Sequence, residues 1–451
     1  MGRVRVLAMD HFFDQDLRAL EAHPDLDVRR FPYQRLRNPA LRIMTEAISA
    51  GLRGYNDPRL RQRRLRYAAW LRREVRRLFL ERAFDVLVLP SDTFFYVRAL
   101  PVAVHELGIP VVVVQKETTI SADTMKAHSR LTRDEAPFIA DFMTVCSNRQ
   151  REFWLRAGAD ASVIEVTGQP RFDVYASRRL RPASVRKRVL FLSYELDAYV
   201  PEADHAAGSA RTWETLRDAT ESVLLDAVRA GSCDVVVKCH PQQNYRVERA
   251  RLARHAGQEW NRGVSLAGPN ADTRDLILAS DCVVGFQTTA IYEAVAASRP
   301  VVFAAWGEAY DRLRGGLIPF YDAPPACVSK ARSAAQLATL LAEKQQPPSS
   351  SACAAWYEEA LGSVDGGATE RVAARLQKIA ADWRPTAERR LLERRRRSHA
   401  VGLLVRSFAA EAVWTAAVPA ARLAGQQHRV EARRCRAREG RWMAMTTIHG
   451  G

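Results

Sequence analysis

The chain has 451 residues, of which 47% are hydrophobic, and this is enough for two domains with ordinary cores and an appendage. Its formal net charge of +17 favours an anionic partner, such as a nucleic acid, a membrane surface or an acidic substrate. The seven cysteines include no Cys-x-x-Cys pair, which argues against a zinc site and a disulfide framework and fits a reducing cytoplasm.

The positive charge is concentrated in two segments. Residues 384–451 hold 15 Arg and no Lys against five Glu, and residues 53–82 hold 11 Arg against three acidic residues. No stretch of about 18 uninterrupted apolar residues occurs, so we expect no transmembrane span. The apolar run at 4–9 is short and contains Arg5, so it predicts a first strand and not a signal peptide.

The first part of the chain repeats a strand–helix pattern. Residues 3–9 predict a strand that ends at Asp10 and His11, without the glycine-rich turn of dinucleotide-binding proteins. Residues 41–82 predict mostly helix, whose arginines form either a solvated face or a surface for anionic lipid. Further strands are predicted at 84–90, 109–114, 142–146 and 162–167. The repeat predicts a doubly wound α/β domain over 1–175.

A second α/β domain is predicted over 188–383, after a linker at 176–187 that is rich in Arg, Pro and Ser. Helices are expected at 213–229, 333–344 and 368–383, and strands at 189–193, 235–237, 282–284 and 301–304. Short β-branched strands that alternate with helices are typical of a parallel sheet.

The basic tail at 384–451 begins with the run ERRLLERRRR at 388–397 and continues with a helical pattern at 400–424. A central Arg406 or Glu411 costs about 3 kcal/mol in a bilayer, so we do not expect this helix to span one. Two interpretations stay open: an amphipathic helix in the membrane interface, or a loosely packed or disordered tail, with 426–451 disordered in either case.

Polar residues follow two strands of the second domain at their carboxyl ends, where open α/β sheets bind ligands. The segments of interest contain Lys238, His240 and Pro241 after one strand, and Gly285, Gln287, Thr288, Thr289 and Glu293 after the other, where Gly285 is expected to let the backbone turn closely. A cation and an imidazole suit a phosphate, and hydroxyls and amides at a helix N-terminus favour an anion. Glu293, one turn into the helix, would accept hydrogen bonds from a ribose. Each motif alone also fits a plain turn or helix cap, but together they predict a nucleotide site.

These motifs resemble those of GT-B glycosyltransferases from bacterial surface polysaccharide assembly. His240-Pro241 is similar to the HP motif that contacts the donor phosphate in CDP-glycerol glycerophosphotransferases and in capsule sialyl- and Kdo-transferases, and Thr288-Thr289 is similar to their downstream Ser/Thr pair. Residues 167–173 (TGQPRFD) resemble the segment that joins the two halves in glycerophosphotransferases. Residues 279–302 also resemble non-hydrolysing UDP-GlcNAc 2-epimerases. The likeness is best over 189–306 and looser over 1–380.

The resemblance implies two Rossmann-like domains that face a central cleft, with helix 368–383 returning to the first domain. It implies a transferase that uses a nucleotide-activated sugar or polyol, CMP- or CDP-linked, and a surface polysaccharide or lipid-linked acceptor at the inner face of the plasma membrane. No Asp-x-Asp motif follows a strand in this region, so we expect no metal ion and no other cofactor. The protein's own cations would then neutralise the leaving nucleotide.

An inverting transfer also needs a base for the acceptor hydroxyl, which we expect at a strand end of the first domain. Glu117 is the first candidate because it follows the most apolar strand, and Asp92, His11 and Asp10 compete with it. Each also fits an ordinary surface, capping or packing role.

Two alternative functions remain open. One is a UDP-sugar 2-epimerase, which the Arg-rich additions argue mildly against, and the other is a non-enzymatic membrane- or nucleic-acid-binding protein. The absence of a zinc finger or an RNP motif argues against nucleic acid.

Overall fold

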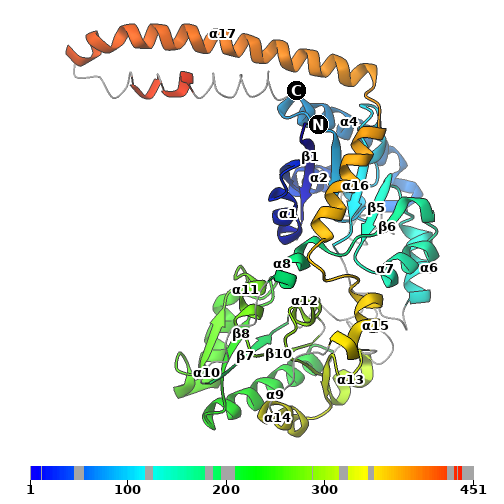
Figure 1. Cartoon of the computed structure of the whole chain (residues 1–451), viewed down its shortest axis with the longest axis vertical. Helices are drawn as coiled ribbons and strands as arrows, with labels where there is room; N and C mark the ends of the chain where they lie inside the picture. Colours follow the sequence, from blue (N-terminus) through cyan, green and yellow to red (C-terminus); the bar gives the residue numbers. More distant parts are fainter. Residues whose placement is uncertain are drawn as a thin grey trace.

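Two parallel six-stranded sheets form the body of the molecule (Figure 1). The computed structural model describes residues 2–11, 13–44, 55–116, 125–177, 186–194, 209–286, 288–313, 323–343, 350–423, 431–433 and 435–438. The strand orders are β2-β1-β3-β4-β5-β6 and β12-β11-β10-β7-β8-β9. Within each sheet all the paired strands run parallel, so their carboxyl ends lie along one edge.

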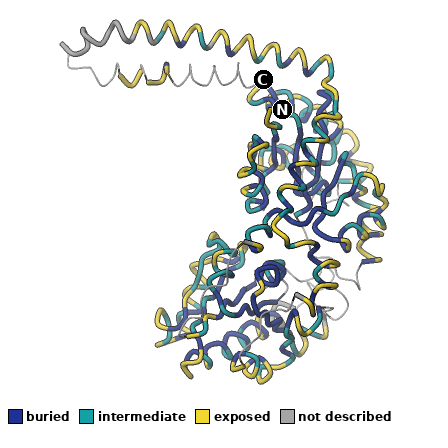
Figure 2. Tube along the Cα trace, viewed as in Figure 1, coloured by how far each residue is buried: buried dark blue, intermediate teal, exposed yellow. Residues whose placement is uncertain are grey.

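The first sheet is built by the amino-terminal part of the chain. Its strands are β1 (Val4–Asp10), β2 (Leu26–Pro32), β3 (Val86–Leu89), β4 (Val111–Val114), β5 (Phe142–Val145) and β6 (Ile164–Val166). Its main helices are α1 (Asp14–Glu21), α2 (Gln34–Met44), α4 (Arg61–Glu81), α5 (Leu100–His105), α6 (Met125–Glu135) and α7 (Asn148–Arg156). Every residue of β3, β4 and β5 is buried, as in parallel sheets that helices cover on both faces (Figure 2).

The second sheet follows the connecting helix α8 (Asp173–Ser177). Its strands are β7 (Lys187–Leu192), β8 (Cys233–Lys238), β9 (Val264–Ala267), β10 (Cys282–Gly285), β11 (Val301–Ala304) and β12 (Ser329–Ala331). Its helices are α9 (Ser209–Arg229), α10 (Tyr245–Ala256), α11 (Thr273–Leu278), α12 (Ala290–Ala296), α13 (Gly307–Leu313), α14 (Ala334–Ala342) and α15 (Ser350–Ala360). The alternation of strand and helix agrees with the doubly wound pattern expected from the sequence.

Helix α16 (Ala368–Asp382) returns from the second sheet to the first. Its residues Val372 and Leu376 are buried in the same core as Val6 of β1. The carboxylate of Asp173 accepts hydrogen bonds from the first amides of α16, those of Ala368 (2.9 Å) and Thr369 (2.6 Å). Helix α16 therefore packs against the first strand of the chain, and its first turn is held by α8.

Gly362 lies just before α16, where the chain crosses between the two sheets. Its φ is +71°, and a Cβ there would lie 1.8 Å from the carbonyl oxygen of Cys146. This close backbone approach therefore requires a glycine.

Helix α17 (Ala387–Leu423) has 37 residues, and a helix of this length extends roughly 55 Å. We call the first sheet with its helices the first unit, and the second sheet with its helices the second unit. The first turns of α17 dock on the first unit through Arg76–Glu388 (2.5 Å) and Arg389–Asp85 (2.6 Å), and Leu392 is buried there. The remainder projects away from the body (Figure 1). In the part of the chain that the structure describes, no helix is both long and apolar enough to cross a bilayer.

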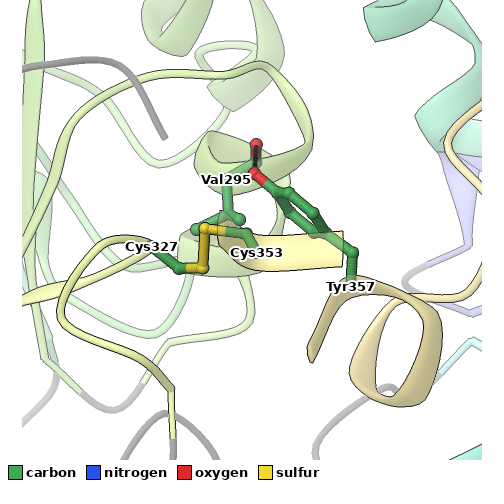
Figure 3. The surroundings of a disulfide bond; sticks show 4 residues. All are labelled: Val295, Cys327, Cys353 and Tyr357. Atoms are coloured by element: carbon green, nitrogen blue, oxygen red, sulfur yellow. Dashed lines mark hydrogen bonds between the residues drawn. A yellow bond between two sulfur atoms is a disulfide. The ribbon is translucent and has the colours of Figure 1, made fainter. Parts of the chain in front are cut away.

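A disulfide bond joins Cys327, just before β12, to Cys353 of α15 (Figure 3), which corrects our expectation from the sequence. Both residues are buried, and their Cα atoms are 5.7 Å apart although 26 positions separate them in the chain. No short-range spacing marks such a pair, because tertiary packing alone brings it together. The hydroxyl of Tyr357 also donates to the carbonyl of Val295 (3.1 Å), so α15 is fastened to the second unit at two points.

Candidate nucleotide-binding site

Lys238, the last residue of β8, is buried at the carboxyl edge of the second sheet. Its ammonium group donates to the carbonyls of Cys239 (2.7 Å) and Pro269 (2.9 Å). Burial lowers the pKa of Lys238. The side chain therefore ties β8 to the loop before α11, and a phosphate would have to compete with these two carbonyls for it.

His240 and Pro241 follow directly, with His240 half-buried and Pro241 exposed. The backbone amide of Gln242 donates to Nδ1 of His240 (3.3 Å), so a neutral His240 carries its proton on Nε2. Burial first, and Lys238 second, lower the pKa of His240. At neutral pH this imidazole is therefore an Nε2–H donor with no charge of its own.

Gln243, which the sequence analysis did not select, organises this turn. Its side-chain oxygen accepts from the amide of His240 (2.7 Å), and its nitrogen donates to Ser193 Oγ (3.2 Å) and to the carbonyl of Tyr194 (3.0 Å). The side chain is buried and joins the carboxyl ends of β7 and β8. In the sequence, the position of Gln243 two residues after the His-Pro pair is the feature that could have pointed to it.

Gly285 ends β10, and its φ is not in the left-handed region. A Cβ there would lie 3.2 Å from Ile291, so the glycine lets α12 pack closely on its strand and does not serve the turn that we expected. Thr288 Oγ1 accepts from the amide of Ala290 (3.3 Å), whereas Thr289 makes no side-chain cap bond. Gln287 lies outside the described residues.

Glu293 lies inside α12 and is 7% exposed. Its carboxylate accepts a hydrogen bond from the hydroxyl of Tyr175 in α8 (2.9 Å). Burial raises the pKa of Glu293, and the charge of Arg171 opposes this. The residue expected to face a ribose is thus held at the junction between the two units.

The same junction contains Asp16, from α1 of the first unit. This buried carboxylate accepts from the side chain of Gln169 (2.7 Å) and from the amide of Arg171 (3.0 Å), and Arg171 Nη1 lies 3.6 Å from its Oδ2. Burial raises the pKa of Asp16, and Arg171 opposes this. The charge of Arg171 thus acts on two buried carboxyl groups, Asp16 and Glu293. The sequence analysis quoted residues 167–173 but did not predict these contacts.

The base candidates of the first unit are not equivalent in the structure. Asp92 is fully buried, and its Oδ2 accepts hydrogen bonds from the amides of Ile139 (2.7 Å) and Ala140 (3.3 Å). The hydroxyl of an acceptor substrate therefore cannot reach this oxygen while the loop that contains Ile139 and Ala140 is in place. Burial raises the pKa of Asp92. His11 and Asp10 are half-buried at the end of β1, and Glu117 lies outside the described residues.

No group of three or more His, Cys, Asp or Glu side chains suitable for a metal ion occurs among the residues that the structure describes.

Comparison with known proteins agrees with this architecture. No curated protein matches the sequence. A Listeria monocytogenes protein described as a UDP-N-acetylglucosamine 2-epimerase is similar in structure, with a TM-score of 0.50 and 14% identity over 86% of this chain and 99% of that chain. The UDP-GlcNAc 2-epimerase of Methanocaldococcus jannaschii has a TM-score of 0.49 and 12% identity, over 83% of this chain and 99% of that chain. The wall teichoic acid polymerase TagF has a TM-score of 0.49 and 12% identity, over 85% of this chain and 90% of that chain.

The first of these likenesses confirms the predicted two-domain GT-B fold. The sequence comparison is more specific, because the family model of CDP-glycerol:poly(glycerophosphate) glycerophosphotransferases matches residues 115–378, more than half of the chain. The match runs from just after β4 into α16 and includes the whole polar edge of the second sheet. The chain therefore belongs to the CDP-glycerol:poly(glycerophosphate) glycerophosphotransferase family and is a transferase.

Proposed function

We propose that the protein transfers a polyol phosphate or sugar from a CDP- or CMP-linked donor to a growing surface polysaccharide or a lipid-linked acceptor. The observation that carries this proposal is the family match over residues 115–378. The matched region contains His240 after β8 and Thr288-Thr289 after β10, two strands that flank β7 in the sheet.

In this reaction a hydroxyl oxygen of the acceptor bonds to the transferred group, while the bond from that group to the nucleotide's phosphate oxygen breaks. The nucleotide leaves with the bonding electrons, and the hydroxyl proton passes to a base. The Nε2–H of His240 suits the leaving phosphate, because a fixed donor aimed at developing charge stabilises the transition state. Thr289 supplies a second hydroxyl without a cap bond of its own.

Thermal unfolding with CMP, CDP, UMP, UDP, GDP and ADP, each with and without EDTA, tests the donor. A nucleotide present at 100 times its Kd adds about 2.7 kcal/mol to the free energy of unfolding. We expect stabilisation by CMP or CDP that persists in EDTA and is lost in His240→Ala. His399→Ala is the matched control, because His399 is exposed on α17. Stabilisation by UDP alone would instead favour the epimerase, and none with any nucleotide would refute the site.

We also propose that the protein works at the cytoplasmic face of an anionic membrane. The projecting part of α17 exposes Val405 (63%) and Phe408 (51%) after the four arginines at 394–397. Each basic residue near anionic lipid contributes about 1 kcal/mol, and apolar side chains beside them enter the interface. A lipid-linked acceptor would then be within reach of the enzyme.

A further inference from the structure

Gln243 holds His240 by both of its backbone polar groups. The amide of His240 donates to Oε1 of Gln243 (2.7 Å), and the carbonyl of His240 accepts from the backbone amide of Gln243 (3.0 Å). Pro241, which lies between them, has a fixed φ and restricts the backbone of the residue before it. The conformation of His240 is therefore fixed by the proline that follows it and by two hydrogen bonds to Gln243.

The side-chain amide of Gln243 is used at both ends. Its Oε1 faces a backbone N–H, which only donates, and its Nε2 faces the carbonyl of Tyr194 (3.0 Å), which only accepts. These partners assign the oxygen and the nitrogen of the amide. A carboxylate of the same size would lack the donor, and a thioether would lack both hydrogen bonds. The position therefore uses the acceptor and the donor that a primary amide combines.

The groups that anchor Gln243 belong to a closely packed part of the second unit. Ser193 and Tyr194 directly follow β7, and both are buried. The Tyr194 hydroxyl donates to the carbonyl of Trp213 in α9 (3.1 Å), and its ring lies against that of Phe286, with centroids 4.9 Å apart. Phe286 directly follows β10. Gln243 thus connects the turn after β8 to the packed ends of β7 and β10.

The orientation of the imidazole depends on the same turn. The backbone amide that donates to Nδ1 of His240 (3.3 Å) is that of Gln242, which lies between Pro241 and Gln243 in the chain. This contact persists only while the turn keeps its shape. The tautomer with the proton on Nε2, the one that suits a leaving phosphate, is therefore stabilised by the turn that Gln243 closes.

We propose that Gln243 is a positioning residue of the donor site, which holds His240 with its Nε2–H ready for the nucleotide's phosphate. This inference rests on the proposed function. Gln243 is 5% exposed and protein groups occupy both ends of its side-chain amide, so it acts through His240 and not on the nucleotide. A donor that is already oriented needs no reorganisation when charge develops on the leaving group.

A purely structural role is the competing explanation, in which Gln243 stabilises the second unit and nothing more. The two roles differ in how they involve the imidazole. A structural Gln243 would affect nucleotide binding whether or not residue 240 is a histidine, whereas a positioning Gln243 affects it only through His240. A double-mutant cycle of Gln243 with His240 separates the two roles.

Isothermal titration calorimetry with CDP on the full chain measures this cycle. Gln243→Met keeps the length of the side chain and removes both of its hydrogen bonds. We expect it to weaken CDP binding at least fivefold in the wild-type background and less than twofold in the His240→Ala background. Urea unfolding of the same four proteins reports the structural contribution of Gln243, which should be equal in the two backgrounds.

Gln258→Met is the matched control, because Gln258 is exposed in the 3-10 turn Gly257–Glu259 and should leave CDP binding unchanged. Gln243→Asn is the second variant, for the case in which Gln243→Met does not fold. It keeps the amide but is one methylene too short to reach both His240 and Tyr194, so it should give the same pattern.

Nitrogen-15 NMR of histidine-labelled protein gives a readout that does not depend on the affinity for CDP. At neutral pH, above the lowered pKa of His240, the wild type should show this ring with a bare Nδ1 and a protonated Nε2. The signal is assigned by its absence in His240→Ala. Gln243→Met should shift both nitrogens toward the average of the two tautomers, and Gln258→Met should match the wild type.

Two results would overturn the positioning role even where CDP binds the wild type. One is a loss of CDP affinity that is equal in both backgrounds, and the other is a His240 tautomer that Gln243→Met leaves unchanged. Where His240→Ala binds CDP too weakly to close the cycle, the tautomer decides alone. Absence of CDP binding to the wild type would instead refute the proposed function.

Discussion

At the scale of single residues, the hydrogen bond from Tyr175 to Glu293 holds a buried carboxylate at the candidate site. The Tyr175 hydroxyl is the one hydrogen-bond donor to the Glu293 carboxylate that the described contacts contain. Tyr175→Phe leaves a buried carboxylate without this donor, which costs about 1–3 kcal/mol of the free energy of unfolding. Urea unfolding at pH 7 measures this loss.

Tyr357→Phe is the matched comparison, because the Tyr357 hydroxyl donates to a neutral backbone carbonyl, that of Val295. A net loss of about 0.5–1.5 kcal/mol is typical of such a bond. Equal losses in the two variants would show that the charge of Glu293 plays no part in the contact.

Individual residues also show where sequence reasoning stops. The β-branched runs place His240 and Thr288 after strands, because strand positions follow from local composition. The direction of the Lys238 side chain, toward two carbonyls, and the meeting of Asp16, Arg171 and Glu293 depend on contacts between distant segments. No local pattern encodes these contacts.

At the scale of elements, β2 was missed because it is an edge strand with a charged outer face. Its Arg30 pairs with Asp14 and Glu21 of α1, so charges interrupt the apolar pattern that marks the inner strands. The disulfide between the approach to β12 and α15 was missed for a different reason, since it joins two elements that meet only in the folded chain. Buried parallel strands are thus read more easily from sequence than edges or cross-links.

Helix α17 gives a prediction at this scale. Replacing Val405 and Phe408 together by Glu should reduce binding to vesicles with anionic lipid at least tenfold. Burying each apolar side chain contributes about 1.5–3 kcal/mol, and 1.4 kcal/mol corresponds to a factor of ten. Co-sedimentation with phosphatidylglycerol-containing vesicles measures the change. Val247→Glu is the control, because Val247 is 59% exposed on α10, and binding that is equal in all three proteins would contradict membrane docking by α17.

At the scale of the whole molecule, the two units are joined by charged contacts from several elements. Arg149 of α7 binds Glu359 of α15 (2.8 Å), Gln15 of α1 binds Asp272, and the charge of Arg171 acts on both Asp16 and Glu293. These contacts set how the two units lie relative to each other. Burial raises the pKa of both Asp16 and Glu293, so their protonation bears on how the two units are held together.

Asp16 makes this dependence testable through pH. Burial raises its pKa in the folded protein above the value of about 3.9 for an unfolded Asp. The native state then binds more protons than the unfolded state, so Asp16 lowers the free energy of unfolding as pH rises from about 4 through its folded pKa. Asp16→Asn keeps an oxygen for Gln169 and for the Arg171 amide but removes the titration. The variant should therefore gain stability relative to the wild type as pH rises over this range.

Urea unfolding at intervals between pH 4 and pH 8 measures the difference between wild type and Asp16→Asn. Asp226→Asn is the control, since the Asp226 side chain is 73% exposed on α9 and lies far from the junction in the chain. A difference for Asp16→Asn that stays constant with pH, or that changes in the opposite direction, would mean that Arg171 outweighs burial. The Asp16 carboxylate would then stay ionised and paired with Arg171 over the whole pH range tested.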